Sequence, residues 1–283
     1  MRIIQGTTDI RFDFPTAVTL GKFDGLHIGH QKLIRELKLA AETNQKIVVF
    51  TFDVSPASVL HQSMPALTTQ EEKRRLMAAM GVDYLIEYPF TDETRNMDAI
   101  WFVRELLVER LGMKTMAVGS DCRFGYERGG DVYLLRKMSD ELDFSLHVVE
   151  KVRTIKDGQI VSSSRIKEAL KKGDIEEANR LLGYLYSVHG QVVNEQGTQI
   201  TANIEKENDT WLIDQCEGER KIILPPGQYF SEVLFGDYEV KGVTNIMENV
   251  TETGELLTIL NEPISEKYQR FIPKIRLIAQ FRG

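Results

Sequence analysis

Hydrophobic residues in the first part of the chain form short continuous runs separated by helically spaced stretches. The runs at 17–20 (AVTL) and 47–52 (IVVFTF) are short and contain β-branched residues, which predicts two buried strands. Between them, apolar residues recur at the spacing of an amphipathic helix, at Leu33, Ile34, Leu37 and Ala41. The pattern therefore predicts a strand–helix–strand unit.

The same alternation continues to about residue 182. We expect helices over 69–80, 98–111, 162–170 and 174–182, and strands over 84–86, 115–118 and 145–149. Thr69 and Glu72 have the spacing of a capping box, and Gly112 is expected to end the second of these helices. Strands separated by helices predict a doubly wound α/β domain with a parallel sheet. Ligands of such sheets bind beyond the carboxyl ends of the strands.

From residue 187 onward the pattern changes to short strands separated by turn residues. The strand-like segments are VHGQVV, TWLI, KIILPPGQYFSEVLF, YEVKGV, ELLTIL and KIRLIAQF. Helical spacing is sparse in this part. We therefore predict two domains, a doubly wound α/β domain at 1–183 and a small, mainly β domain at 184–283.

Composition narrows the class of protein. With 283 residues, 42% of them hydrophobic and 27% charged, the chain has the profile of a soluble globular protein. It contains no apolar run near the ~20 residues of a membrane span and no signal-peptide pattern, so we expect a cytoplasmic protein without a membrane partner. The net charge of −7 argues against nucleic acid as a partner. Cys122 and Cys216 lie far apart, and two free thiols are expected.

The segment 21–30, GKFDGLHIGH, directly follows the first predicted strand, where a ligand would bind. Its glycines allow close backbone approach or positive φ. His27 and His30 bracket a helix start, whose N–H groups favour anions, and imidazoles there can donate hydrogen bonds to phosphate oxygens during nucleotidyl transfer. The structural alternative is that His27 caps the turn and His30 packs on the sheet. The complete pattern G-x-F-D-x-x-H-x-G-H favours ATP binding and nucleotidyl transfer.

Two further segments are candidate binding elements. Residues 162–167, SSSRIK, combine hydroxyls at a helix start with a cation one turn later, which is typical of an anion site; an ordinary cap with a solvated lysine is the alternative. Residues 118–131, VGSDCRFGYERGGD, form a glycine-rich loop after the fourth predicted strand. Phe124 and Tyr126 could lie against a planar ring, and Asp121 could accept a hydrogen bond or help hold a metal ion. A plain surface loop is the alternative here.

In this order and spacing, the three segments resemble the prokaryotic riboflavin kinase/FAD synthetase family, which belongs to the nucleotidyltransferase superfamily with the H-x-G-H signature. The resemblance implies an FMN adenylyltransferase domain followed by a riboflavin kinase β-barrel. It implies that His27 and His30 are catalytic. Flavin contacts are then expected from Asp121, Phe124 and Gly125, and ATP contacts from Gly21, Phe23, Asp24, Gly29, Ser163, Ser164 and Lys167.

The first domain departs from the family pattern at several positions. Residues 51–56 read TFDVSP where the family usually has TFDPHP, so Ser55 stands in place of a histidine. Cys122 replaces a usual phenylalanine, and Ser164 a usual threonine. Lys167 replaces a usual arginine, which keeps the positive charge but loses the bidentate fork.

The second domain departs further. The family carries G-F-P-T-A-N, whose threonine and asparagine hold Mg-ATP, whereas this chain has TQITAN at 198–203. Thr201 and Asn203 remain, but the glycine and proline that shape the loop are absent. Glu255 is the nearest candidate for the family's catalytic glutamate. The family also continues into a C-terminal helix beyond the position of Gly283. These differences predict a degenerate kinase site with weak or absent activity.

The sequence thus predicts an FAD synthetase that uses ATP and Mg²⁺ to convert FMN into FAD and pyrophosphate, with the metal ligands left open. Three alternatives remain: a bifunctional riboflavin kinase/FAD synthetase, an adenylyl- or cytidylyltransferase with another acceptor, and a flavin- or nucleotide-binding regulator without turnover. The expected partners are small molecules, ATP and FMN, with riboflavin added if the kinase half is active.

Overall fold

The computed structural model describes residues 1–53, 65–193, 198–207, 209–215, 219–249 and 253–281. The chain divides into two compact units, one made of residues 1–64 and 70–160, the other of residues 65–69 and 161–283. The departure at Ser55 and the second cysteine, Cys216, lie outside the described residues. Within the described residues, no helix has the length and apolar character that a membrane crossing requires.

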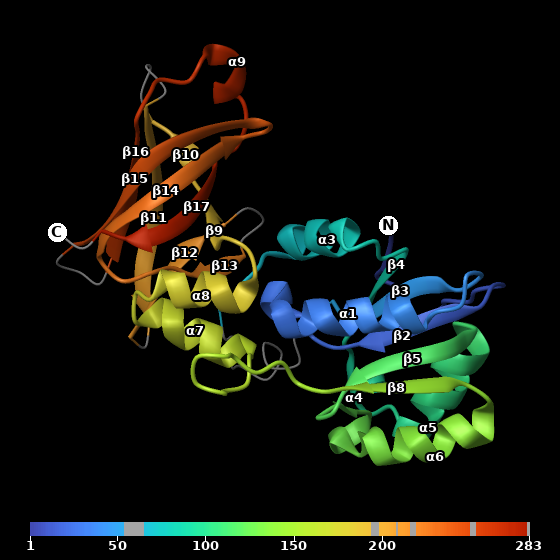
Figure 1. The fold of residues 1–283 in the computed structure, drawn as a ribbon. Helices are drawn as coiled ribbons and strands as arrows, with labels where there is room; N and C mark the ends of the chain where they lie inside the picture. Colours follow the sequence, from blue (N-terminus) through green and yellow to red (C-terminus); the bar gives the residue numbers. More distant parts are fainter. Residues whose placement is uncertain (54–64, 194–197, 208, 216–218, 250–252, 282–283) are drawn as a thin grey trace. The chain divides into compact units, whose positions relative to one another are not determined.

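The first unit is an α/β domain built on a six-stranded sheet in which every pairing is parallel (Figure 1). The strand order is β1-β4-β3-β2-β5-β8. The strands are β1 (Arg2–Gln5), β2 (Thr16–Leu20), β3 (Lys46–Phe52), β4 (Tyr84–Tyr88), β5 (Met113–Gly119) and β8 (Ser145–Val149). The predicted doubly wound sheet is confirmed, and β1 is an additional edge strand. From β2 the chain builds toward β4 and then returns to β5 on the other side of β2, which creates a topological switch point between β2 and β5.

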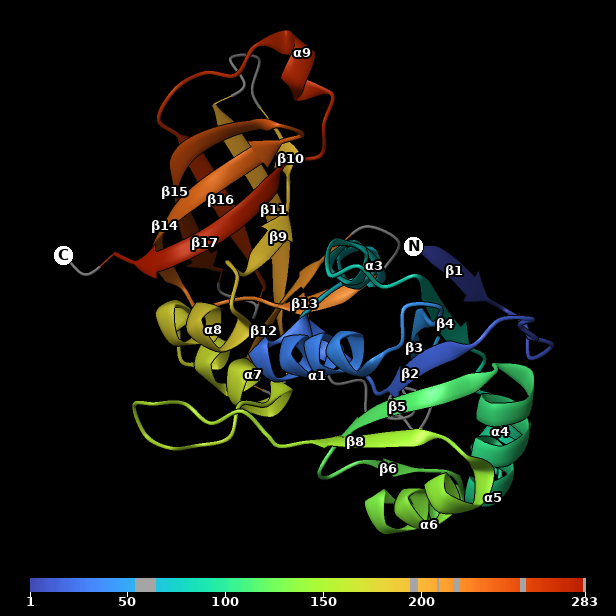
Figure 2. The ribbon, with the colours of Figure 1, turned by 45° about the vertical axis from the view of Figure 1, so that its right-hand side comes forward.

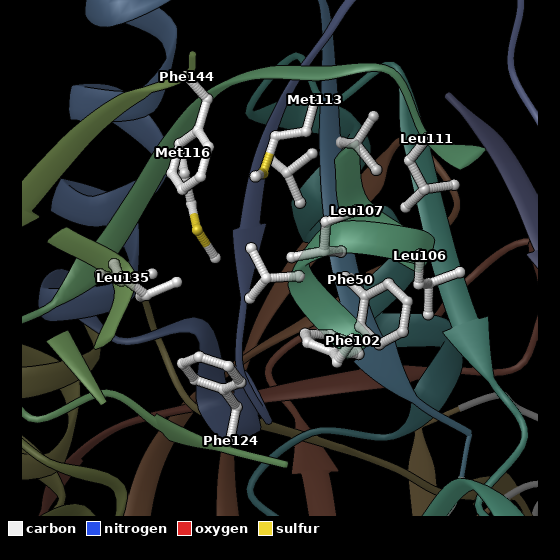
Figure 3. Close-up of a cluster of buried hydrophobic side chains, with 14 of the residues drawn as sticks. Phe50, Phe102, Leu106, Leu107, Leu111, Met113, Met116, Phe124, Leu135 and Phe144 are labelled. Atoms are coloured by element: carbon white, nitrogen blue, oxygen red, sulfur yellow. The ribbon is translucent and has the colours of Figure 1, made fainter. Parts of the chain in front are cut away.

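Helices cover both faces of this sheet. On one face, α1 (Ile28–Ala40) and α3 (Gln70–Ala79) contribute Leu37 and Met77 to a core that includes Ala17 of β2. On the other face, the π-helix η2 (Phe102–Arg110) and α6 (Val132–Leu142) contribute to a second core that includes Val18 (Figure 3). Adjacent residues of β2 thus face opposite cores, as the alternation of a strand requires.

The helix predicted over 98–111 is present but changes type along its length. After the short α4 (Asp92–Arg95), Asp98 caps α5 (Ala99–Trp101) by accepting 2.9 Å hydrogen bonds from the N–H groups of Ile100 and Trp101. In η2 the backbone bonds widen to i→i−5 spacing, as from Leu111 N–H to the Leu106 carbonyl, 3.0 Å. Hydrophobic periodicity predicts a helix here but not its hydrogen-bond register.

The second unit begins with α7 (Ser163–Lys171) and α8 (Ile175–Leu182) and continues as an antiparallel barrel (Figure 2). Its strand order is β13-β12-β11-β16-β15-β14-β17-β9, and β10 pairs with β11. Only Gly190 separates β9 (Ser187–His189) from β10 (Gln191–Val192). The pairing of β10 with β11 therefore connects the last strand of this order back to β11 and closes the barrel. The other elements are β11 (Gln199–Glu207), β12 (Thr210–Asp214), β13 (Arg220–Ile222), β14 (Gly227–Phe235), β15 (Tyr238–Glu248), β16 (Thr253–Leu260), α9 (Glu266–Gln269) and β17 (Lys274–Gln280). The prediction of a mainly β second part is confirmed.

The helices α7 and α8, which the sequence pattern assigned to the first domain, pack in the second unit. Asn179 of α8 donates from Nδ2 to the Leu277 carbonyl of β17 at 2.9 Å and accepts at Oδ1 from the Tyr186 N–H at 2.7 Å. The Tyr186 hydroxyl in turn donates to the Ile222 carbonyl at 2.6 Å. The compact unit therefore starts at residue 161 rather than at the predicted boundary of 183–184. An amphipathic helix reveals which face it buries but not which partner covers that face.

Gly254 lies where β16 approaches the backbone of β15 closely. A Cβ at this position would lie 2.2 Å from the Met247 carbonyl oxygen. We expect Gly254→Ala to lower the free energy of unfolding of the second unit by about 3 kcal/mol, because a backbone oxygen cannot move aside without disturbing the sheet. Gly236→Ala is the control, since its nearest neighbour, Phe271, would be 3.4 Å away and only the backbone strain at φ 69° would add a cost. Urea unfolding followed by circular dichroism measures both variants, and equal midpoints would contradict the prediction.

Candidate active site

Two loops of the first unit follow the carboxyl ends of β2 and β5, the adjacent strands at the switch point. The loop after β2 leads through the short helix η1 (Asp24–Leu26) into α1 and carries the sequence GKFDGLH. The loop after β5 contains β6 (Arg123–Phe124), η3 (Tyr126–Arg128) and β7 (Gly130–Asp131). The topology thus places residues 21–30 and 118–131 at the same edge of the sheet, in agreement with the strand order predicted from the sequence.

The loop after β2 has a strained backbone. Phe23, Gly25 and Leu26 have φ values of 52°, 78° and 34°. Phe23 and Leu26 are each only 1% exposed and pack in the core beneath α1. Positive φ in a bulky residue is unfavourable and persists only where surrounding packing imposes it, which is typical of functional sites.

His27 and His30 lie at the N-terminus of α1, as predicted. His27 is the helix N-cap, and its Nδ1 accepts a hydrogen bond from the His30 N–H at 3.4 Å. His27 therefore does cap the turn, as the structural alternative for this residue predicts. This capping role does not exclude a catalytic role for His27. An Nδ1 that accepts a hydrogen bond assigns the proton of a neutral imidazole to Nε2, which can then donate to a ligand.

Aromatic contacts and glycines hold the two imidazoles. The His27 and His30 rings stack with centroids 3.7 Å apart and planes 17° apart, and Phe23 meets His30 edge-on at 5.2 Å. A Cβ on Gly29 would lie 3.1 Å from Cε1 and Nδ1 of His27, and one on Gly21 would lie 3.3 Å from the Phe23 ring. The motif glycines therefore permit the close packing that positions the histidines.

Burial keeps both imidazoles neutral. Desolvation lowers the pKa of His27 to about 4, against the opposing effect of the buried Asp24 carboxylate. Desolvation, followed by the charge of His27, lowers the pKa of His30 well below its ordinary value. A triphosphate beside these rings would favour the protonated forms, so anion binding and proton uptake are coupled at this site.

We expect the free energy of unfolding to fall as the pH decreases from 6.5 to 4. His27 titrates at 6.5 in the unfolded chain and at about 4 in the folded one, so the unfolded chain binds more protons throughout this window and acid favours unfolding. The shift corresponds to about 3 kcal/mol. Denaturant titrations across this range should show a steeper loss for the wild type than for His27→Asn. Parallel pH profiles for the two proteins would contradict the assignment.

The residues of the loop after β5 that are candidates for flavin contact differ in burial. Phe124 is 8% exposed and packs in the core against Phe102, with ring centroids 5.8 Å apart (Figure 3). Its ring is therefore largely covered by protein, and its contact with a planar ligand stays a prediction. Tyr126 is 49% exposed, and Asp121 is exposed and forms a 2.7 Å ion pair with Lys151.

Gly125 is the predicted flavin-site residue for which the structure gives a steric reason. Its φ is 72°, and a Cβ there would lie 2.6 Å from Cβ and 2.7 Å from Cα of Ala99. The thiol of Cys122 in the same loop is partly buried, and burial raises its pKa to about 12, so it stays protonated and unreactive at neutral pH.

The predicted phosphate-binding residues lie on α7 in the second unit. The Ser162 hydroxyl caps this helix by accepting from the Arg165 N–H at 3.3 Å, and Ser163 and Ser164 are its first two residues. Lys167, one turn later, is 5% exposed, so the alternative of a solvated lysine is wrong. These residues belong to the second unit.

The barrel brings together the residues predicted for the kinase site. TQITAN is not a loop throughout, because most of it lies in β11, where Asn203 is directly opposite Glu255 of β16. The Thr201 hydroxyl donates to the Glu255 carboxylate and lies 3.1 Å from the Leu256 carbonyl. Sequence reasoning found each residue separately; the antiparallel register places them in one cluster.

Oxygen donors suited to Mg²⁺ are present in this cluster. Mg²⁺ prefers oxygen ligands and is commonly held by one or two carboxylates together with substrate phosphates. Thr201, Asn203 and Glu255 supply a hydroxyl, an amide and a carboxylate, which fits a cation carried by ATP. Among the described residues, no group of three or more His, Cys, Asp or Glu side chains forms a candidate metal site.

The parallel sheet, the paired imidazoles at a helix N-terminus and the adjoining glycine-rich loop define a nucleotidyltransferase. Residues 10–165 match the family described as FAD synthetase. The chain belongs to the FAD synthetase family, whose members use ATP and FMN to produce FAD, typically with Mg²⁺.

Relatives resemble the chain beyond the first unit. A bifunctional riboflavin kinase/FMN adenylyltransferase of Listeria monocytogenes is 35% identical over 216 residues, covering 73% of this chain and 67% of the relative. The enzyme of the same description from Escherichia coli K12 is 33% identical over 247 residues, covering 84% and 74%. A crystal structure described as a macrolide-efflux protein from Streptococcus pneumoniae has a TM-score of 0.79 at 22% identity, covering 100% of this chain and 90% of the other, and shows the fold alone.

Proposed function

We propose that the first unit catalyses adenylyl transfer from ATP to FMN. An oxygen of the FMN phosphate attacks the α-phosphorus of ATP, the bond from that phosphorus to the bridging oxygen breaks, and pyrophosphate leaves as FAD forms. The observation that carries this proposal is the pair of neutral, stacked imidazoles at the N-terminus of α1, at the switch point of the sheet. Phosphoryl and nucleotidyl transfer depend mainly on positioning and on stabilising charge.

The histidines act as donors to the phosphate that develops charge. His27 presents an Nε2–H because its Nδ1 is engaged by the backbone, and the helix N-terminus adds a favourable dipole. Gly21 and Gly29 allow the triphosphate to approach the backbone. The contacts of Ser163, Ser164 and Lys167 with the outer phosphates stay a prediction for α7, whose N-terminus carries the two hydroxyls and whose Lys167 is buried one turn later. The lysine supplies a point charge where an arginine would supply a fork.

The loop after β5 is the proposed flavin element. With Phe124 committed to the core, the flavin contacts fall to the backbone around Gly125, to exposed Tyr126 and to Asp121, which Lys151 holds in place. Tyr126 offers the exposed aromatic face that the buried Phe124 cannot.

The proposal is tested by incubating the pure protein with FMN, ATP and Mg²⁺ and measuring FAD and pyrophosphate. We expect both products in equal amounts. Tight FMN binding without pyrophosphate release would instead support a regulator that has lost turnover. Formation of a different adenylylated or cytidylylated product in a mixture of acceptors would move the proposal to another transferase.

Riboflavin phosphorylation in the second unit is a second candidate function. The observation that favours it is the Thr201–Glu255 hydrogen bond, with Asn203 opposite the same carboxylate. This cluster supports the bifunctional alternative more than the altered TQITAN segment suggests. Ile200, which stands where the family has proline, is fully buried in the barrel, and the substitution still favours a rate below that of adenylyl transfer. Incubation with riboflavin, ATP and Mg²⁺, followed by separation of the flavins, measures this activity directly.

A further inference from the structure

The hydroxyl of Thr19 is a buried polar group near the carboxyl end of β2. Thr19 is fully buried near the carboxyl end of β2, and its Oγ1 makes no hydrogen bond among the residues that the structure describes. Thr16, at the start of the same strand, is equally buried, but its hydroxyl donates to the Leu111 carbonyl at 2.8 Å. An unpaired buried hydroxyl is costly and calls for an explanation.

Thr19 faces the side of the sheet on which α1 lies. Strand alternation places it on the same face as Ala17, and its neighbours across the sheet are Val49 and Ala117. Ala17, Val49 and Ala117 belong to the core that also contains Ile34 and Leu37 of α1. His30 lies one turn before Ile34 on that helix, so His30 and Thr19 share one layer at the carboxyl end of β2.

His30 presents a matching unpaired atom. Its Nδ1 is buried and, within the described part of the chain, has no hydrogen-bond partner, although the residue is partly exposed. Nε2 is therefore the nitrogen that remains to face a ligand. His27 differs, because the backbone of His30 engages its Nδ1 and assigns its proton to Nε2. No hydrogen bond among the described residues makes the same assignment for His30.

We propose that Thr19 is a positioning residue for adenylyl transfer, whose hydroxyl donates to Nδ1 of His30 when the nucleotide is bound. The hydrogen bond would hold the neutral ring as the Nε2–H tautomer, so that His30, like His27, donates toward the phosphates. No hydrogen bond joins the two atoms in the structure, so the His30 ring must turn. In the structure this ring stacks on His27 and meets the edge of Phe23. This inference rests on the proposed function.

The test compares Thr19→Val, Thr19→Ser and Thr16→Val. Thr19→Val should lower kcat for FAD formation by roughly 10-fold or more with little change in KM, since Thr19 does not touch substrate. Its melting temperature should match or exceed that of the wild type, because no hydrogen bond is lost. Thr19→Ser should restore kcat. Thr16→Val should do the reverse, lowering the melting temperature by roughly 2–4 °C while leaving kcat unchanged.

Nitrogen-15 NMR of the histidine rings separates this inference from the proposed function. With a non-hydrolysable ATP analogue bound, His30 should be a single Nε2–H tautomer in the wild type and a mixture in Thr19→Val. If the wild type forms no FAD, the proposed function fails, whereas the tautomer still reports on the Thr19–His30 pair. Wild-type kcat and tautomer in Thr19→Val would overturn the inference. A melting temperature lowered as in Thr16→Val would also overturn it, because it would show that the hydroxyl is already paired.

Discussion

His27→Asn is expected to lower kcat for FAD formation by roughly 100- to 1000-fold while leaving the protein folded. Removing one donor to a developing negative charge typically has this effect. Asparagine is among the best N-cap residues, so its side-chain oxygen can replace Nδ1 as acceptor for the His30 N–H. The substitution therefore removes the imidazole and keeps the cap.

Two comparisons make this experiment specific. His27→Ala removes both the donor and the cap and should add a loss of about 1 kcal/mol in the free energy of unfolding. His147→Asn changes an exposed histidine on β8 and should leave kcat unchanged. The rate is measured as release of FAD and pyrophosphate. A kcat for His27→Asn within threefold of the wild type would contradict the catalytic role of His27 on which the proposed function depends.

Glu255→Gln is expected to abolish most riboflavin phosphorylation, by roughly 100-fold or more, and to leave FAD formation from FMN unchanged. A carboxylate placed to accept the proton of an attacking hydroxyl typically contributes this much. Glutamine preserves the size of the side chain and an acceptor for the Thr201 hydroxyl, so the change removes the base and little else. FMN formation from riboflavin and FAD formation from FMN are measured separately on the same preparations.

Glu239→Gln is the matched control for this prediction. Glu239 is a partly exposed glutamate of β15 in the same barrel, where it pairs with Arg276 at 3.4 Å, and its loss should change neither activity. Equal riboflavin kinase rates for Glu255→Gln and the wild type would show that Glu255 is not the base. A wild type that makes no FMN would support the prediction of an inactive kinase half.

Most of the first domain could be predicted because its signals are local. The strands β2, β3, β4, β5 and β8 are short apolar runs, and the helices between them show helical spacing. Strand β1 was missed because residues 2–5 are largely exposed at the sheet edge and lack such a run. The position of His27 and His30 followed from the order strand, loop and helix, since parallel strands place such loops at one edge.

The barrel was harder to predict because its contacts join distant residues. The sequence of the TQITAN segment predicts an altered loop, whereas β11 pairs in register with β16, more than 50 residues away, and brings Thr201 to Glu255. No local pattern carries that register. The same limit applies to α7 and α8, whose amphipathic faces are evident in the sequence but whose partners are strands of the second unit.

The sequence by itself determined the fold class, the family and the position of the loop predicted to bind ATP, because these depend on periodicity and on residues close together in the chain. Tertiary structure alone decided which polar atoms are satisfied. It buried Phe124 in the core and engaged Nδ1 of His27, and among the described residues it left Nδ1 of His30 and the Thr19 hydroxyl without a hydrogen-bond partner. Burial and hydrogen bonding depend on the elements that pack around a residue, and the chain order does not specify them.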